Sequence, residues 1–310
     1  MNKISIVGAG RVGESAAQFI AGNDLCREIA LIDVREGAAE GAALDIQEVA
    51  PLCQFDTRLY GGSDYSLIKD SNMVVITAGL PRKPGMSRSD LLESNVAIID
   101  SVLEGVHKYA PDSMLLFVSN PVDVLTYHAF IQTGWPRNRI FGQAGVLDSS
   151  RMASFIAMET GYSTQDINTM VLGGHGDTMV PIMRYTTISG IPISHFLSQA
   201  KLDEIVERTR NGGAEILALR QNSSAYGAPA ASVAEMVDAI VHNRKRILPT
   251  VAVLEGEYGL SGIAIGVPAV LGINGMEKVI SLEMNDEETT LFHNSAALVK
   301  KDIGLLKQTS

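Results

Sequence analysis

The sequence contains few cysteines and few basic residues. Its two cysteines, Cys26 and Cys53, have apolar neighbours and no metal-ligand spacing, so we expect two buried free thiols rather than a disulfide, and a reducing compartment. Only 25 residues are Lys or Arg against 35 that are Asp or Glu, which gives a formal net charge of −10. This excess of negative charge argues against a nucleic-acid partner, because a polyanion needs basic residues gathered over a whole face.

Long apolar runs are also missing. No stretch of roughly 18 apolar residues occurs, so we do not expect a membrane-spanning helix. An apolar strand pattern begins by Lys3, which leaves no room for the charged and apolar regions of a targeting peptide. We therefore expect a cytoplasmic protein. With 310 residues, the chain is long enough for two domains of ordinary size, each with a buried core.

The first half of the chain alternates between apolar runs and helical patterns. The runs are apolar on consecutive residues, which is typical of strands covered on both faces in a parallel sheet. They span residues 4–7, 29–33, 73–78 and 114–119. Helical spacing follows at about 12–20 and 89–109, and a further helix around Ala42 is expected to end at Pro51. The alternation predicts βαβ units and a Rossmann-type doubly wound parallel sheet.

The second half has a different pattern. A helix is expected at about 149–160 and another from about Asp286, and between them strand-like runs are separated by glycine and proline. Such runs point to antiparallel pairing, above all between 247–256 and 262–275. The sequence therefore predicts an α/β protein in two domains. These are a doubly wound domain over 1–144 and an α+β domain with antiparallel strands over 145–310.

A glycine-rich turn connects the first strand to the first helix. In GAGRVG, Gly8, Gly10 and Gly13 have the GxGxxG spacing, in which the backbone turns tightly, approaches a pyrophosphate and lets helix and strand pack closely. The motif alone is weak, but it follows a strand, opens a helix and is answered by Asp33 at the end of the next strand. A carboxylate there accepts hydrogen bonds from a ribose diol and repels a 2′-phosphate, so the pattern favours NAD over NADP. Arg35 weakens that preference slightly.

Several polar residues occur at positions where the pattern predicts apolar or purely structural residues. Asn120 follows the fourth strand at its carboxyl end, where open α/β sheets bind ligands. Asp148 and Arg151 share one face at the start of a helix, which an ion pair with helix capping would also explain. His175 lies between glycines in GGHGD, where it is a candidate acid–base group or a structural histidine.

A cationic loop precedes the long helix of the first half. The stretch LPRKPGMSR sets Arg82, Lys83 and Arg88 among two prolines and a glycine in an acidic protein, which suggests a small anion as ligand. Proline and glycine at both ends of a polar segment are typical of a lid that closes over a ligand. An ordinary connection between a strand and a helix is the alternative.

Taken in order, GAGRVG, Asp33, PRKPGMSR, SNPVD, LDSSR and GGHGD resemble the motifs of the lactate/malate dehydrogenase family. The similarity runs from residue 3 to beyond residue 300 and favours the malate-specific members of the family. It implies reversible hydride transfer between a 2-hydroxy acid and NAD, in which NAD carries the redox chemistry and no metal is required. Malate and oxaloacetate are the expected substrates, which would place the protein in the tricarboxylic acid cycle.

The resemblance also implies roles for the polar residues. His175 would exchange a proton with the substrate oxygen, and Asp148 would hold its imidazole in the required tautomer. Arg151 would bind the carboxylate beside the reacting carbon through a bidentate contact, and Arg88 would polarise the substrate carbonyl. Asn120 would contact both the nicotinamide and the substrate oxygen. The expected cofactor-binding residues are Gly8, Gly10, Gly13, Asp33, Asn95 and Asn120.

The expected choice of substrate depends mostly on Arg82. Lactate dehydrogenases usually carry an uncharged glutamine at this position, so the resemblance assigns Arg82 to the second carboxylate of a dicarboxylate, and Lys83 is left to solvent. By alignment, the pocket wall near Ala225 is small where lactate enzymes usually carry threonine, which leaves space for a longer substrate. A lactate or other 2-hydroxyacid dehydrogenase is the alternative, although it would leave Arg82 unpaired against a methyl group.

Two further alternatives come from outside this reaction class. An NAD- and metal-dependent glycosidase would need a metal site, and neither cysteine lies near GGHGD to suggest one. A non-catalytic NAD-binding regulatory protein would keep the glycines and Asp33 but need not keep the histidine, aspartate and arginines described above. The resemblance finally implies a homo-oligomer, in which a tetramer is favoured over a dimer.

Overall fold

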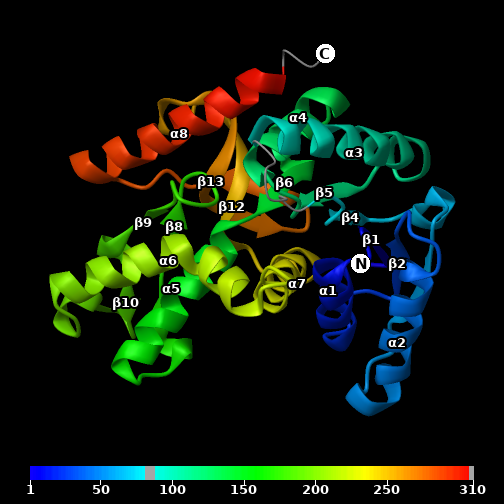
Figure 1. The fold of residues 1–310 in the computed structure, drawn as a ribbon, viewed down its shortest axis with the longest axis horizontal. Helices are drawn as coiled ribbons and strands as arrows, with labels where there is room; N and C mark the ends of the chain where they lie inside the picture. Colours follow the sequence, from blue (N-terminus) through cyan, green and yellow to red (C-terminus); the bar gives the residue numbers. More distant parts are fainter. Residues whose placement is uncertain (81–87, 307–310) are drawn as a thin grey trace.

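The computed structural model describes residues 1–80 and 88–306. Its main feature is a nine-stranded sheet in the order β14-β13-β12-β6-β5-β4-β1-β2-β3, with helices on both faces (Figure 1). The first six strands of the chain pair in parallel. They are β1 (Lys3–Val7), β2 (Glu28–Ile32), β3 (Arg58–Gly62), β4 (Met73–Ile76), β5 (Met114–Phe117) and β6 (Ile140–Gln143).

Most of the parallel strands are buried on consecutive residues because both faces of the sheet are covered, and β3 at the edge of the sheet is the exception. All residues of β1, β4 and β6 are buried, and only the first residue of β2 and of β5 is partly exposed. From β1 the chain first adds strands outward to β3, and it then returns to add β4, β5 and β6 on the other side. The predicted doubly wound sheet is therefore confirmed, and its strand order reverses between β1 and β4.

Two helical layers enclose this sheet, and each contains helices from both halves of the chain. One layer holds α1 (Arg11–Gly22), α2 (Ala38–Cys53) and α7 (Gly227–Val241) (Figure 1). The other holds α3 (Arg88–Tyr109), α4 (Val122–Thr133) and α8 (Asp286–Leu306). Because α1 packs on α7 and α4 packs on α8, the second half of the chain completes layers that the first half begins.

The sheet itself also continues past residue 145. The strands β12 (Arg246–Glu255), β13 (Ser261–Gly272) and β14 (Gly275–Val279) extend it in antiparallel fashion, and β12 pairs with β6 so that Thr250 lies opposite Gln143. The predicted antiparallel pairing of the two long runs is confirmed. The structure adds that these runs join the parallel sheet directly.

The remaining elements of the second half surround a smaller core. Its helices are α5 (Gly145–Thr160) and α6 (Gln199–Arg220), which contribute Met152, Ile156, Leu202 and Ile205 to that core. Its short strands are β7 (Ile167–Asn168), β8 (Val171–Leu172), β9 (Val180–Pro181), β10 (Thr187–Ile188) and β11 (Ile191–Pro192). Short 3-10 helices span Tyr65–Ile68, Arg137–Arg139, Thr164–Asp166, Met183–Tyr185, Ile193–His195 and Glu257–Gly259.

Two predicted helix ends are wrong. The helix α2 continues past Pro51 to Cys53, because a proline removes only its own hydrogen-bond donor and the Gln54 N–H still donates to the Ala50 carbonyl at 2.8 Å. The helix α5 begins at Gly145 instead of about residue 149. Its first turn is closed by a hydrogen bond from the Asp148 N–H to the Ala144 carbonyl at 3.1 Å.

The expectation of two buried thiols is correct for only one cysteine. Both cysteines are free, and Cys26 is buried, which raises the pKa of its thiol to about 12. Cys53 is exposed because it ends α2, where its apolar neighbour Leu52 also faces solvent with 83% of its surface exposed. Within residues 1–80 and 88–306, no helix combines the length and apolar character needed to cross a membrane.

Candidate functional site

The carboxyl ends of β1, β2 and β4 open into a cleft of about 800 Å³. We call it the glycine cleft, because Gly8, Gly10 and Gly79 contribute to its lining together with Asp33 and Arg35. It lies at the point where the strand order reverses, which is where open α/β sheets bind their ligands. Three of the predicted cofactor-binding residues therefore lie together in one cleft.

The three motif glycines serve different physical purposes. Gly8 has a φ of +106°, and a Cβ there would lie 2.6 Å from the Ala78 nitrogen. A Cβ on Gly13 would lie 1.9 Å from the Gly8 carbonyl oxygen, so only glycine lets α1 pack so close to β1. A Cβ on Gly10 would meet no atom within 4 Å, because this residue faces the open cleft at the N-terminus of α1. The turn therefore fits a pyrophosphate that approaches the backbone at Gly10.

Asp33 is held ionised at the edge of the glycine cleft. Its Oδ2 accepts a hydrogen bond from the Ala9 N–H at 2.8 Å, and Arg35 donates to both carboxylate oxygens at 3.0 and 3.1 Å. Burial opposes ionisation, but these hydrogen bonds outweigh it and lower the pKa of Asp33. The Arg35 N–H also donates to Oδ1 at 2.9 Å, so Asp33 already accepts the roughly four hydrogen bonds that a carboxylate can take, and an adenine ribose would bind it by displacing the exposed Arg35 side chain.

Asn95 holds two backbone segments together. Its side chain is buried, accepts a hydrogen bond from the Leu80 N–H at 2.7 Å and donates to the Asn120 carbonyl at 2.7 Å and the Leu80 carbonyl at 3.3 Å. Both of its amide hydrogens are therefore engaged by main-chain oxygens. In the described structure, Asn95 fixes the positions of Leu80, which lines the glycine cleft, and Asn120, which lines the next cleft.

A second cleft of about 350 Å³ contains His175, and we call it the histidine cleft. Its lining includes the predicted residues Asn120, Arg151, His175 and Ala225, which come from four separate parts of the chain. Val12, in the first turn of α1, also lines it, so the histidine cleft begins beside the glycine-rich turn. The fold thus places the polar residues of the second half next to the glycine cleft.

Asp148 links His175 and Arg151 by hydrogen bonds. Its Oδ2 lies 2.8 Å from His175 Nδ1, and its Oδ1 accepts a hydrogen bond from Arg151 Nη1 at 3.1 Å. The Asp148 side chain is only 2% exposed, whereas 19% of the His175 side chain remains accessible. Burial acts to lower the pKa of His175, but the Asp148 carboxylate outweighs it and raises this pKa. The imidazole can therefore hold a proton near neutral pH while its Nε2 remains available for a ligand.

The helix α6 makes room for the guanidinium of Arg151. A Cβ on Gly212 would lie 3.2 Å from Arg151 Cδ, and one on Gly213 would lie 3.8 Å from its Nη2. Arg151 Nε is buried without a hydrogen-bond partner among the described residues, so the guanidinium keeps donors for an anion. The sequence reasoning missed these two glycines. Their signal is a glycine pair inside a polar helical segment, where glycine costs helix stability.

The loop that carries His175 is held at three consecutive residues. Gly173 pairs with Gly266 through two backbone hydrogen bonds. The Gly174 N–H donates to Ser295 Oγ at 2.9 Å, and the His175 N–H donates to Asp123 Oδ2 at 2.9 Å. Asp123 lies in the first turn of α4, within SNPVD, and Ser295 lies in α8; neither was predicted as part of the site.

The cationic loop is largely outside the structural description. Arg82, Lys83 and the predicted lid fall outside the described residues. For Arg88 the structure describes only the backbone, which begins α3. The contacts predicted for these cations therefore remain predictions.

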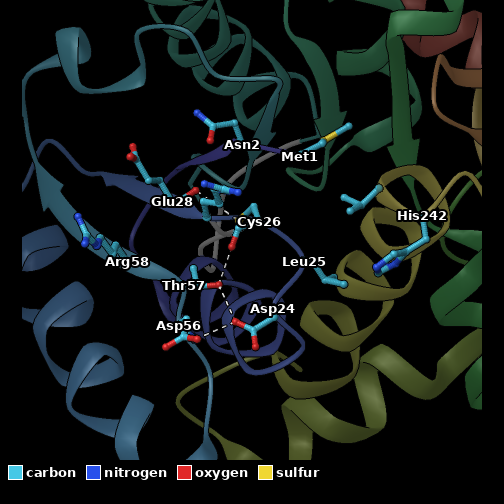
Figure 2. A pocket seen from close by; sticks show the side chains of 12 residues that line it. Met1, Asn2, Asp24, Leu25, Cys26, Glu28, Asp56, Thr57, Arg58 and His242 are labelled. Atoms are coloured by element: carbon cyan, nitrogen blue, oxygen red, sulfur yellow. Dashed lines mark hydrogen bonds between the residues drawn. The ribbon is translucent and has the colours of Figure 1, made fainter.

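A further depression of about 800 Å³ lies at the amino ends of the parallel strands, opposite the glycine cleft (Figure 2). It is lined by residues at the amino ends of β1, β2 and β3, including Asn2, Cys26 and Asp56, and by Val241 and His242 at the end of α7. Several of its polar groups bond to one another, as Thr57 Oγ1 does to the Cys26 carbonyl at 2.7 Å. We therefore place the candidate site at the carboxyl ends of the parallel strands. In the described part of the chain, no group of three or more His, Cys, Asp and Glu side chains could hold a metal ion.

Together, the doubly wound sheet and the glycine cleft define an α/β dinucleotide-binding protein. Residues 2–142 match the NAD binding domain of lactate/malate dehydrogenase, and residues 145–309 match the alpha/beta C-terminal domain of the same family. The chain belongs to the lactate/malate dehydrogenase family, as its motifs predict, and the family match agrees with the predicted cofactor NAD.

Individual relatives agree with this assignment. The chain is 67% identical to a malate dehydrogenase of Thioalkalivibrio sulfidiphilus over 307 residues, which cover 99% of this chain and all of that protein. It superposes on the malate dehydrogenase of Salinibacter ruber with a TM-score of 0.95 and 43% identity, covering 99% and 98% of the two chains. A lactate dehydrogenase of Cryptosporidium parvum, solved with lactic acid and NAD, has the same TM-score at 36% identity, covering 99% and 98%. Backbone similarity alone therefore does not separate the two activities.

Proposed function

We propose that the chain is an NAD-dependent malate dehydrogenase, which interconverts malate and oxaloacetate. The observation that carries the proposal is the 2.8 Å contact between His175 Nδ1 and Asp148 in a cleft shared with Arg151 and adjoining the glycine cleft. The relative at 67% identity is a malate dehydrogenase, which supports malate over lactate.

The proton chemistry follows from the contacts of His175. Because Asp148 engages Nδ1, the other ring nitrogen, Nε2, takes the hydroxyl proton of malate and returns it when oxaloacetate is reduced. When bound, NAD would accept the hydride that leaves C2 of malate, and the C–O bond would become a carbonyl as His175 takes the proton. Asp148 holds the tautomer and stabilises the imidazolium. Arg151 directs its guanidinium donors to the carboxylate beside C2.

The remaining assignments extend the same proposal. Arg88 polarises the substrate carbonyl, and Arg82 binds the second carboxylate; Asn120 contacts the nicotinamide and the substrate oxygen. The cofactor is held by Gly8, Gly10, Gly13, Asp33, Asn95 and Asn120. For Asn95, the hydrogen bonds to Leu80 and Asn120 support an indirect contribution, through the backbone on which the cofactor would lie.

We further propose how these parts belong together. Residues 1–144 are the cofactor domain and residues 145–310 the substrate domain, although the two share one sheet. The active enzyme is a homo-oligomer, with a tetramer favoured over a dimer, and it acts in the cytoplasm as part of the tricarboxylic acid cycle.

A direct assay tests the proposal. The purified protein is mixed with NADH and either oxaloacetate or pyruvate, and the loss of NADH absorbance is followed. We expect rapid oxidation with oxaloacetate and little with pyruvate. Faster turnover of pyruvate would make the protein a lactate dehydrogenase instead. Tight NADH binding without turnover of either keto acid would favour a non-catalytic regulatory protein.

A further inference from the structure

Asp123 places a second carboxylate at His175. Its residue surface is only 5% exposed, and its Oδ2 accepts the hydrogen bond from the His175 backbone N–H at 2.9 Å. Its other oxygen, Oδ1, is buried and has no hydrogen-bond partner within the described residues. A buried polar atom without a partner costs free energy, so the stability of the fold does not by itself account for a carboxylate here.

The neighbouring residue of the same loop shows that a neutral side chain is enough to hold the backbone. The Gly174 N–H donates to the hydroxyl of Ser295, which is 2% exposed, at the same 2.9 Å distance. Holding a main-chain N–H therefore does not require a charge. The carboxylate at Asp123 differs from Ser295 in bringing a negative charge into the protein interior at the backbone of His175.

The charges around His175 indicate what this second carboxylate does. From α5, the Asp148 carboxylate contacts both His175 and the cation of Arg151, so the pair of Asp148 and Arg151 is neutral in total. Before substrate binds Arg151, protonation of the imidazole adds a buried positive charge that this pair does not balance. A buried charge without a counter-charge is unfavourable in a medium of low polarity.

Two other charged residues line the histidine cleft, and both differ from Asp123 in burial. Asp177, in the same loop, is exposed, so solvent screens its carboxylate. Arg210 comes from α6; its side chain is 27% exposed and lies 4.0 Å from the Glu207 carboxylate. Among the described residues around His175, Asp123 is thus the buried anion that remains after Asp148 and Arg151 are paired.

We propose that Asp123 is a positioning residue that holds the His175 loop and, as a buried anion, stabilises the imidazolium formed during malate oxidation. This inference rests on the proposed acid–base role of His175. It assigns to the last residue of SNPVD an electrostatic task distinct from that of Asp148, which touches the ring.

The protonation of Asp123 agrees with this role. Burial raises its pKa to about 6, and the hydrogen bond from the His175 N–H limits the increase. The group is therefore ionised at and above neutral pH, when its charge would be used. For His175, burial acts to lower the pKa, whereas Asp148 first and Asp123 in addition act to raise it.

The test compares the parent enzyme with Asp123→Asn. The amide oxygen can still accept the His175 N–H, so the loop contact is kept while the charge is removed. Loss of a negative charge disfavours the imidazolium and lowers the pKa of His175. At saturating cofactor, the pH profiles of kcat/KM for malate and for oxaloacetate should both move to lower pH by about half a unit or more. That displacement is about a threefold change in the ratio of imidazolium to imidazole.

Ser295→Ala is the matched control, because it releases the adjacent Gly174 N–H without changing any charge. We expect it to lower kcat or stability while leaving the pH profile in place. Coincident profiles for the parent and Asp123→Asn would overturn the inference. So would an equal displacement in Ser295→Ala, since loosening of the loop would then explain both.

Two provisions keep the test decisive. If Asp123→Asn does not fold, Asp123→Ser is measured in the same way, because its hydroxyl can still accept a hydrogen bond, and the same displacement is expected. The parent enzyme separates the two proposals. A parent that turns over neither malate nor oxaloacetate removes the proposed function, whereas an active parent with an unmoved variant profile removes only the role of Asp123.

Discussion

The glycine cleft and the histidine cleft are built in opposite ways. The glycine cleft is formed by consecutive βα units, and its central residues Gly8, Gly10 and Asp33 lie within 26 positions of one another. The histidine cleft is assembled from α1, the segment after β5, α5, the loop after β8, α6 and α7, with residues as distant as Val12 and Pro229. The first cleft depends mainly on the backbone and the space left by missing side chains, the second mainly on charged side chains.

This difference predicts which substitutions each cleft should tolerate. In the glycine cleft, added atoms should do more harm where less space is available. In the histidine cleft, a substitution that keeps size and removes charge should do the most harm, because the surrounding groups stay buried without their partner. The following four predictions separate these two kinds of sensitivity.

The largest effect is expected for His175→Asn. Removing the acid–base group should lower kcat by about 10²- to 10⁴-fold, while the glycine cleft and NADH binding are left intact. Steady-state kinetics and NADH fluorescence titration measure the two effects separately. His195→Asn is the control, because His195 is exposed at the surface and should change neither value. A His175→Asn variant with parental kcat would refute the proton role.

Arg82→Gln should come next. If Arg82 binds the second carboxylate, its loss costs on the order of 2–5 kcal/mol. That corresponds to a fall in kcat/KM for oxaloacetate of roughly 30-fold to several thousand-fold, with little change for pyruvate. Lys83→Gln, one residue away, is the control and should have almost no effect. Full oxaloacetate activity in Arg82→Gln would show that substrate choice is made elsewhere.

Asp33→Ala tests the carboxylate of the glycine cleft. Hydrogen bonds to a charged group contribute about 1.5–3 kcal/mol, so NAD affinity should fall about 10- to 150-fold. NADP should be affected less, because Arg35 is then released from Asp33 and no carboxylate repels a 2′-phosphate. Dissociation constants for both cofactors provide the measurement, with the exposed carboxylate of Glu36 replaced by alanine as the control. Equal losses for NAD and NADP would contradict the assignment.

The smallest effects separate two glycines of one motif. Gly13→Ala should lower the free energy of unfolding by about 1–3 kcal/mol, because its Cβ would lie 1.9 Å from the Gly8 carbonyl. Gly10→Ala should cost less than about 1 kcal/mol, mainly through the weaker helix cap, and should instead weaken NAD binding. Urea unfolding and cofactor titration of both variants measure this contrast. Equal loss of stability in the two would mean that the turn has relaxed around Gly13.

The same contrast explains which parts of the fold are predictable from sequence. The strands β1, β2, β4 and β5 and the helices α1 and α3 carry strong local patterns, and the glycines of the motif around Gly8 have a recognisable spacing. The strands β3 and β6 were not predicted, because β3 is a partly exposed strand that ends in two glycines and β6 has only two large apolar residues. The helices α4 and α7 are buried over most of their surface, so their apolar residues show no single stripe. The helix α6 buries only Leu202, Ile205, Thr209 and Gly212, which is too narrow a stripe to mark it clearly.

In the site, residues that belong to compact motifs are predictable, and residues that act through tertiary contacts are not. His175, Asp148 and Arg151 stand in short motifs whose chemistry is apparent from residue type. Ser295 is an ordinary serine in a helix until the fold brings it 2.9 Å from the Gly174 nitrogen, 121 positions earlier. Asp123 lies in the SNPVD motif, but its contact with His175 depends on how α4 packs against the rest of the fold.

The pairing of β6 with β12 has a consequence for how the chain is made. During synthesis, β6 is complete at Gln143, but its partner strand starts only at Arg246. At about 5–20 residues per second, the edge of β6 stays open for roughly 5–20 s after it leaves the ribosome. An unpaired strand edge invites association with other chains, so the nascent first half is the stage at which this protein is most exposed to misassembly.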